Sequence, residues 1–135
     1  PTSSAHSLRT LILLVGLCAA QSAGAEPAPP EAAAQAYATH CAGCHGATLG
    51  GAFGPPLSGA AFVAKWQGRS GAALLAQLRG TMPPSKPGGL DGATYVALTE
   101  RVLAHNHLPA LTEAEVAAAA SGGATASSEG GSSSG

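Results

Sequence analysis

Charged, aromatic and sulfur-containing side chains are all scarce in this chain of 135 residues. Charged residues make up 10% and the formal net charge is -1, so charge favours neither nucleic acid nor an anionic membrane surface as a partner. Aromatic residues make up 4%, and alanine supplies much of the apolar fraction, so the side chains alone build a thin core. No stretch alternates for long enough to build a sheet. The composition predicts one all-α domain that needs a further source of buried apolar area.

Two of the three cysteines stand in the C-x-x-C-H pattern Cys41-Ala42-Gly43-Cys44-His45. A zinc site would need a second pair of ligands at close spacing, and a thioredoxin-like site would need a βαβ pattern, and the sequence has neither. Two thiols at this spacing can add across the two vinyl groups of a haem, and the adjacent histidine then lies under the iron as its proximal ligand. The motif predicts one covalently attached haem c, whose macrocycle would supply the missing buried area.

The N-terminal segment has the pattern of an export signal. A basic residue precedes an apolar run at 11–20, and a small-x-small site ends at Ala25, just before Glu26. This predicts a signal peptide over 1–25 and a periplasmic protein, because bacteria attach c-type haem outside the cytoplasm. The apolar run is shorter than the roughly 20 residues that span a bilayer. A lipid anchor at Cys18 is the alternative to cleavage.

The remaining chain divides by composition into three parts. Residues 26–36 form a spacer rich in proline and alanine that includes the start of the first helix. Residues 37–112 form the predicted haem domain. Residues 113–135 begin with a short helix, introduced by a capping box over 112–115, and continue as a tail of serine and glycine that we expect to be disordered.

Three main helices are expected in the haem domain and its approach. The first, over 31–40, is rich in alanine and delivers the haem motif. Ser70 caps a second helix that stops at Gly80, and Asp91 caps a third that ends near Ala104.

The sixth iron ligand decides between an electron carrier and a haem enzyme. Met82 is the only methionine, and prolines stiffen the loop that carries it. A thioether favours reduced iron, and a His/Met pair fills both axial positions. Met82 could also be an ordinary apolar loop residue. The competing histidines are His40, which directly precedes Cys41 and is expected at the surface, and His105 and His107 at the end of the last helix.

On these residues the chain resembles a bacterial class I cytochrome c. It is most similar to the small monohaem cytochromes and cytochrome subunits that serve quinoprotein dehydrogenases for alcohols and sugars. The resemblance implies a class I cytochrome c fold, with about three main helices wrapped around one covalently attached haem. The matching segments, in order, are Tyr37, Cys41 to Gly46, Gly54-Pro55-Pro56-Leu57-Ser58-Gly59, Phe62 and Trp66, Met82-Pro83, Pro87-Gly88, and Tyr95. The chain departs from these relatives at 106–109, which leaves the partner's identity open.

The resemblance also implies roles for residues around the haem. The carbonyl of Pro55, or of Pro56, would accept a hydrogen bond from Nδ1 of the proximal histidine and raise its basicity. Trp66 would donate its indole N–H to a haem propionate, or would be a plain core residue. Lys65 and Arg69 are expected to be solvated.

The large apolar residues are expected to pack in two places. Tyr37 and Tyr95 are expected where the first and last helices cross. The other large apolar residues of the loops and the second helix are expected to line the haem pocket, and these are Phe53, Leu57, Phe62 and Leu78.

The function that follows is one-electron transfer by Fe(III)/Fe(II) cycling. We expect a dehydrogenase or respiratory complex as donor, a terminal oxidase as acceptor, no small-molecule substrate, no enzymatic activity, and a monomer when free. Electrons would pass through the haem edge, at a rim around Cys41, Ala42 and the Met82 loop, in small transient encounters. The alternatives are a cytochrome subunit of a quinoprotein dehydrogenase, and a haem enzyme or gas sensor in which Met82 is labile.

Overall fold

A computed structural model describes residues 28–121, and this part of the chain is helical with no strand. The all-α prediction is therefore confirmed. The expected signal peptide, the lipid anchor at Cys18 and the tail beyond 121 lie outside the described residues.

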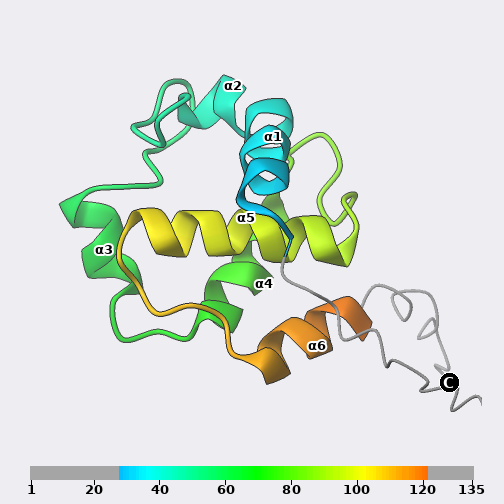
Figure 1. The fold of residues 1–135 in the computed structure, drawn as a ribbon. Coiled ribbons are helices and arrows are strands. Elements are labelled where there is room, and N and C mark those ends of the chain that lie inside the picture. Colours follow the sequence, from blue (N-terminus) through cyan, green and yellow to red (C-terminus); the bar gives the residue numbers. More distant parts are fainter. Residues whose placement is uncertain (1–27, 122–135) are drawn as a thin grey trace, which may run out of the picture.

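Six helices make up the described part of the chain (Figure 1). Three of them, α1, α4 and α5, correspond to the expected main helices, and α6 corresponds to the expected short helix. The helices α2 and α3 were not expected, because four and seven residues are too few for a periodic pattern. In chain order the helices are α1 (Pro30–His40), α2 (Ala42–His45), α3 (Ala60–Trp66), α4 (Gly71–Thr81), α5 (Gly92–His105) and α6 (Glu113–Ser121).

The helix N-termini follow their capping residues. The Ser70 hydroxyl accepts from the backbone N–H of Ala73 at 3.3 Å, and the Asp91 carboxylate accepts from the N–H of Thr94 at 2.9 Å. The capping box before α6 is present in both directions, because the Thr112 N–H donates to the Glu115 carboxylate at 2.8 Å and the Glu115 N–H donates to the Thr112 hydroxyl at 3.2 Å.

The prediction that Gly80 ends the second helix was wrong. Helix α4 continues through Gly80 to Thr81, and its C-cap is Met82, with φ -124° and ψ 148°. A residue before a proline is driven out of the helical region, so Pro83 rather than the glycine ends the helix. As a result, Met82 is the first extended residue after α4.

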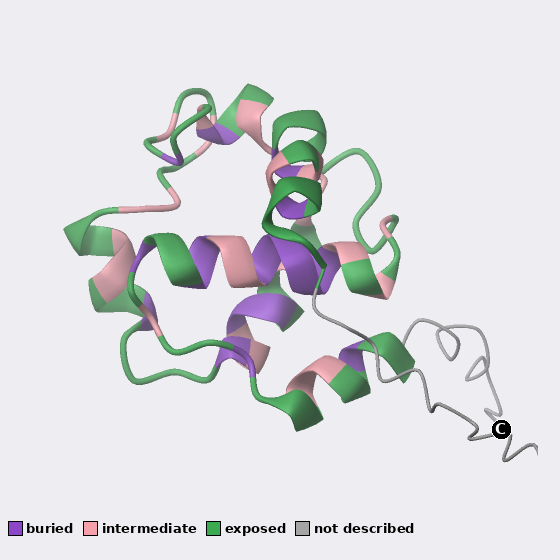
Figure 2. Cartoon of the chain, in the orientation of Figure 1, coloured by how far each residue is buried: buried purple, intermediate pink, exposed green. Residues whose placement is uncertain are grey.

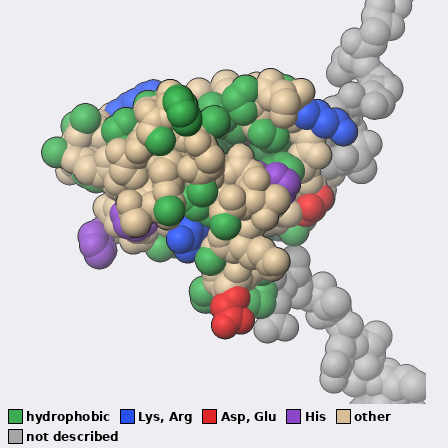
Figure 3. Space-filling view, turned by 90° about the horizontal axis from the view of Figure 1, so that it is seen from above, with side chains coloured by type: hydrophobic (Ala, Val, Ile, Leu, Met, Phe, Trp, Pro, Cys, Tyr) green, Lys and Arg blue, Asp and Glu red, His purple; other side chains and the backbone are tan. Residues whose placement is uncertain are grey.

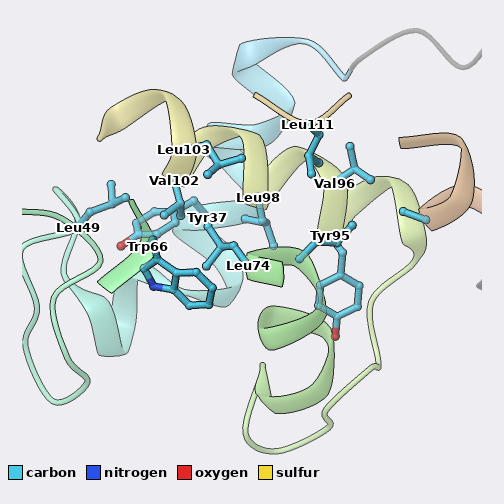
Figure 4. Packing of buried hydrophobic residues seen from close by; sticks show 12 residues of the cluster. Tyr37, Leu49, Trp66, Leu74, Tyr95, Val96, Leu98, Val102, Leu103 and Leu111 are labelled. Carbon is cyan, nitrogen blue, oxygen red and sulfur yellow. The ribbon is translucent and has the colours of Figure 1, made fainter. Parts of the chain in front are cut away.

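Helix α5 is the centre of the fold, and it carries more of the buried side chains than any other described helix (Figure 2). Helices α1 and α4 both pack against it, and α6 packs on it as well. Figure 4 shows the resulting core cluster, whose members come from five of the helices and from two loops. Its most buried members are Tyr37, Leu49, Leu74, Tyr95, Leu98 and Val102.

Both tyrosines are buried, and each hydroxyl fastens a helix to a neighbouring segment. Tyr37 lies at the crossing of α1 and α5, as expected, with the Arg101 guanidinium 5.3 Å from its ring. Its hydroxyl donates to the carbonyl of Gly46 at 2.7 Å. The hydroxyl of Tyr95 donates instead to the carbonyl of Met82, at 2.6 Å, so Tyr95 connects α5 to the end of α4.

Helix α6 is attached to both α4 and α5. The Arg79 guanidinium donates to the carbonyl of Ala119 at 3.1 Å, and the Glu115 carboxylate accepts from the N–H of Ala72 at 3.3 Å. Before α6, the N–H of Leu111 donates to the Glu100 carboxylate of α5 at 2.7 Å. Among the described residues, none of the helices combines the length and the apolar character needed to cross a membrane.

The Asp91 cap generates a pH-dependent prediction. The Thr94 hydroxyl and N–H hold the pKa of the Asp91 carboxyl below its usual value, so its contribution to stability is present above that value and is lost as the pH falls through the lowered pKa. We expect Asp91→Ala to lower the free energy of unfolding by about 1 kcal/mol at neutral pH. Asp91→Asn should retain most of the cap but show a weaker loss of stability at acid pH, as measured by thermal unfolding. An unchanged acid dependence in Asp91→Asn would contradict this assignment.

Candidate functional site

A cavity of about 340 Å³ lies between the haem motif, α3, α4 and α5. His45 and Met82 both line it, as do Cys41 and Trp66, so the structure brings these expected site residues together. The volume falls in the range of cofactor and ligand pockets, which are mostly apolar with a few placed polar groups. The rest of its wall fits that description, and its apolar members include Leu57, Phe62, Leu74, Leu78, Leu98 and Val102.

His45 is buried, and its orientation is fixed by one hydrogen bond. Nδ1 lies 2.7 Å from the carbonyl oxygen of Pro55, and since a carbonyl can only accept, Nδ1 carries the proton. Pro55, and not Pro56, is therefore the acceptor. The tautomer leaves Nε2 with a free lone pair, and Nε2 makes no hydrogen bond within residues 28–121. Such a ring is oriented and made more basic as a metal ligand.

Glycines let the loop after α2 fold back onto His45. The N–H of Gly51 donates to the His45 carbonyl at 2.8 Å, and the N–H of Gly54 donates to the Cys44 carbonyl at 2.7 Å. A Cβ at Gly54 would lie 3.1 Å from Cε1 of the His45 ring. At Gly51, where φ is +88°, a Cβ would lie 2.9 Å from the nitrogen of Pro56. The close approach of this loop therefore places the Pro55 carbonyl.

The two motif cysteines have different surroundings. Cys41 is half-buried in the cavity wall, and burial raises the pKa of its thiol. Cys44 is exposed on α2 and does not line the cavity. Both are free thiols. Two unpaired thiols separated by two residues, one of them in the cavity wall, fit a macrocycle that is attached along one edge.

Met82 lies just after α4, and a hydrogen bond from α5 anchors its backbone. It is half-buried, and with Pro83 it lines the cavity immediately after α4. The Tyr95 hydroxyl anchors its carbonyl, and Tyr95 also lines the cavity. The sequence did not predict that Tyr95 lines the cavity and bonds the Met82 carbonyl, because a tyrosine on an apolar stripe gives no sign of which carbonyl its hydroxyl will reach.

Trp66 is buried in the cavity wall, and two cations lie over its ring. Lys65 Nζ is 5.4 Å and the Arg69 guanidinium carbon is 4.6 Å from the ring centroid, and both side chains are exposed. The Phe62 ring packs beside the indole, 6.2 Å between centroids. The indole N–H makes no hydrogen bond among the described residues, so Trp66 still has a donor to offer.

The prediction that Phe53 lines the pocket was wrong. Its side chain is 97% exposed, in a short turn whose flanking Gly51 and Gly54 bond the carbonyls of His45 and Cys44. The other three expected lining residues, Leu57, Phe62 and Leu78, do lie in the cavity wall. Of the residues expected to line the pocket for their large apolar side chains, Phe53 is therefore the one that lies outside it.

Of the described histidines outside the motif, His40 lines the cavity and the other two do not. His40 is exposed, as expected, yet its side chain also reaches the cavity. His105 and His107 are exposed and do not line it. The structure therefore gives no support to either of the last two as a distal ligand.

Sequence reasoning also missed Asn106. This residue is buried after α5, and its amide donates to the carbonyls of Leu57 and Val102, both at 2.8 Å. It fastens the end of the glycine-rich loop to α5. The available signal was its position just past the last apolar turn, where asparagine commonly ends a helix.

Comparison with known protein families finds one family model that matches this chain. A family model described as Cytochrome C oxidase, cbb3-type, subunit III matches residues 28–100, which is more than half of the chain. The matched region contains the motif, the loop that returns to His45, Trp66, Met82 and Tyr95. No curated protein and no solved structure shows a significant match.

The loop geometry predicts that Gly51 cannot be replaced. In Gly51→Ala the new Cβ would meet Pro56 and the left-handed backbone would be strained, so we expect a loss of about 1–3 kcal/mol in the free energy of unfolding. The matched control is Gly43→Ala, where a Cβ meets nothing within 4 Å. Chemical denaturation of both variants checks the prediction, and equal stabilities would contradict it.

The Tyr95 anchor predicts a local effect on the Met82 loop. Tyr95→Phe removes the donor to the Met82 carbonyl, and we expect a loss of about 1 kcal/mol together with faster amide exchange over 82–90. Tyr37→Phe is the matched control, because it removes an equivalent hydroxyl on the His45 side. Hydrogen exchange should show acceleration at the Met82 loop in the first variant and near Gly46 in the second. The same exchange pattern in both variants would count against the anchor.

Proposed function

The chain belongs to the cytochrome c family whose model describes the cbb3-type oxidase subunit III, and from this premise we propose that it is a monohaem electron carrier that cycles between Fe(III) and Fe(II). A cytochrome c domain implies haem c and electron transfer. The observation that carries the finer proposal is that His45 and Met82 line one apolar cavity, with His45 Nδ1 already engaged by Pro55.

The residues present fit covalent haem. Each thiol of Cys41 and Cys44 would add across a vinyl group, with sulfur bonding to one vinyl carbon and the hydrogen going to the other, so no oxidant is required. His45, through its free Nε2, and Met82, through its thioether, would bind the iron. When bound, the haem supplies a one-electron couple, which a methionine ligand shifts to higher potential.

The other residues position ligands and exclude water. Pro55 fixes the His45 ring, and Tyr95 holds the backbone of Met82. Trp66 would donate its N–H, which has no partner among the described residues, to a haem propionate. Lys65 and Arg69, which are exposed and lie over its ring, would supply positive charge for that carboxylate.

The proposed location is the periplasm, supported by the signal-peptide pattern and by the attachment of c-type haem outside the cytoplasm. The proposed donor is a dehydrogenase or respiratory complex, and the proposed acceptor is a terminal oxidase. A second candidate is a subunit of a larger redox complex. It is favoured by the description of the matching family as an oxidase subunit and by the resemblance to cytochrome subunits of quinoprotein dehydrogenases.

Ligation generates a spectroscopic prediction. Ferric and reduced spectra of the full-length haemoprotein should be low-spin, with the weak far-red ferric band that reports sulfur on iron. Met82→Ala should lose that band, lower the reduction potential and bind carbon monoxide, while His105→Ala, away from the cavity, should leave all three unchanged. A high-spin wild-type spectrum that shifts with carbon monoxide would replace the carrier with the enzyme or sensor. Co-purification of a catalytic subunit would favour the second candidate.

A further inference from the structure

Phe53 is the only large hydrophobic side chain that the described part of the chain leaves exposed, at 97%. An aromatic ring carries 150–250 Å² of area that water disfavours, roughly 25 cal/mol for each Å². Single exposed apolar residues are common, so exposure alone assigns no role. The surroundings of Phe53 supply the further observations.

The loop that carries Phe53 is fixed on both sides. Gly51 is bonded to the His45 carbonyl and Gly54 to the Cys44 carbonyl, and between them the N–H of Ala52 donates to the carbonyl of Gly54 at 3.2 Å. The ring is therefore presented outward from a short, closed loop whose two anchors are the haem motif itself. A side chain held in this way loses little conformational freedom on contact with a partner.

The chain segment that contains this loop carries no formal charge. Residues 32–64 include no aspartate, glutamate, lysine or arginine, although they contain the haem motif, the whole loop and the start of α3. Ala52, which precedes Phe53, is also exposed, whereas Pro55 and Pro56 line the cavity. Figure 3 views the molecule from the side on which α2 lies in Figure 1. Hydrophobic side chains, together with backbone and uncharged polar side chains, make up most of that surface, and Lys or Arg side chains also appear on it.

We propose that Phe53, with Ala52, forms an apolar docking surface for the uncharged face of a redox protein partner. The inference rests on the proposed function, because docking here places the partner beside the backbone of Cys44 and His45. A charged partner face would lose hydration against this surface and gain no opposite charge. Aromatic side chains on rigid supports are the usual anchors of such contacts, which are small and transient in electron transfer.

The partner used in the test is a second copy of this chain, because it presents the same uncharged face. In a mixture of ferric and ferrous full-length haemoprotein, one electron passes from the ferrous copy to the ferric copy, with no proton transferred. The exchange rate is measured from NMR line shapes. With an apolar docking surface, we expect that rate to change less than about twofold between low and high salt, because there are few charges to screen.

Substitutions at Phe53 test the contact directly, and the exposed position allows them to fold. We expect Phe53→Ser to slow exchange about tenfold, equivalent to about 1.4 kcal/mol at a contact hot spot. Phe53→Asp should slow it further, because two like charges would meet. Ala114→Asp is the matched control, since it adds the same charge at an exposed position on α6 and should have no effect. Oxidation by hexacyanoferrate, a small ion that needs no docking, should be the same in wild type and in Phe53→Ser, which have equal charge.

The outcomes distinguish a failure of the proposed electron-carrier function from a failure of the proposed docking surface. If the wild-type protein is not a reversible low-spin one-electron couple, the proposed function fails before docking is measured. If it is, and the Phe53 variants exchange as fast as wild type or the wild-type rate depends steeply on salt, the docking surface is wrong and the carrier stands. A stable dimer in sedimentation that Phe53→Ser dissociates would also overturn the transient docking site and reassign the surface as a subunit interface.

Discussion

The hydrogen bond from His45 Nδ1 to the Pro55 carbonyl is the constraint on which the site depends. It requires the chain to leave α2, turn within ten residues and bring a carbonyl back over the same imidazole. A proline suits the position because it has no N–H to satisfy and its carbonyl remains free to accept. The turn in turn requires glycine where the backbone passes the ring and the following proline. The fold of this loop therefore sets both the orientation of the His45 ring and the position of its free ligand nitrogen, Nε2.

The cavity shows how a chain with so few aromatic residues uses them. Tyr37, Phe62, Trp66 and Tyr95 all line it, and the remaining core is built from leucine, valine and alanine. The protein core is therefore divided into a packed half around α5 and a half that a cofactor completes.

Local patterns predicted the helices well, and contacts distant in sequence were predicted poorly. The caps at Ser70, Asp91 and Thr112 are short-range hydrogen bonds, so three or four residues of sequence suffice to identify them. The resemblance to class I cytochromes c implied the Pro55 bond, which the structure contains. The end of α4 was misplaced because a glycine was weighed above the proline behind it. Phe53 and Asn106 were misjudged or missed, since burial and carbonyl partners are settled by how loops return to the core and not by residue type.

Helix α6 connects to the Met82 loop through two side chains. Arg79 binds the carbonyl of Ala119 near the end of α6, and its guanidinium lies 5.7 Å from the ring of Tyr95, whose hydroxyl holds the Met82 carbonyl. Thermodynamic linkage makes such a connection reciprocal. Arg79 and Tyr95 join α6 to the end of α4 by direct contacts, so a coupling measured from either side must have the same size. The end of α6 also lies beside the start of α5, because a Cβ on Gly92 would lie 2.7 Å from the carbonyl oxygen of Ala119.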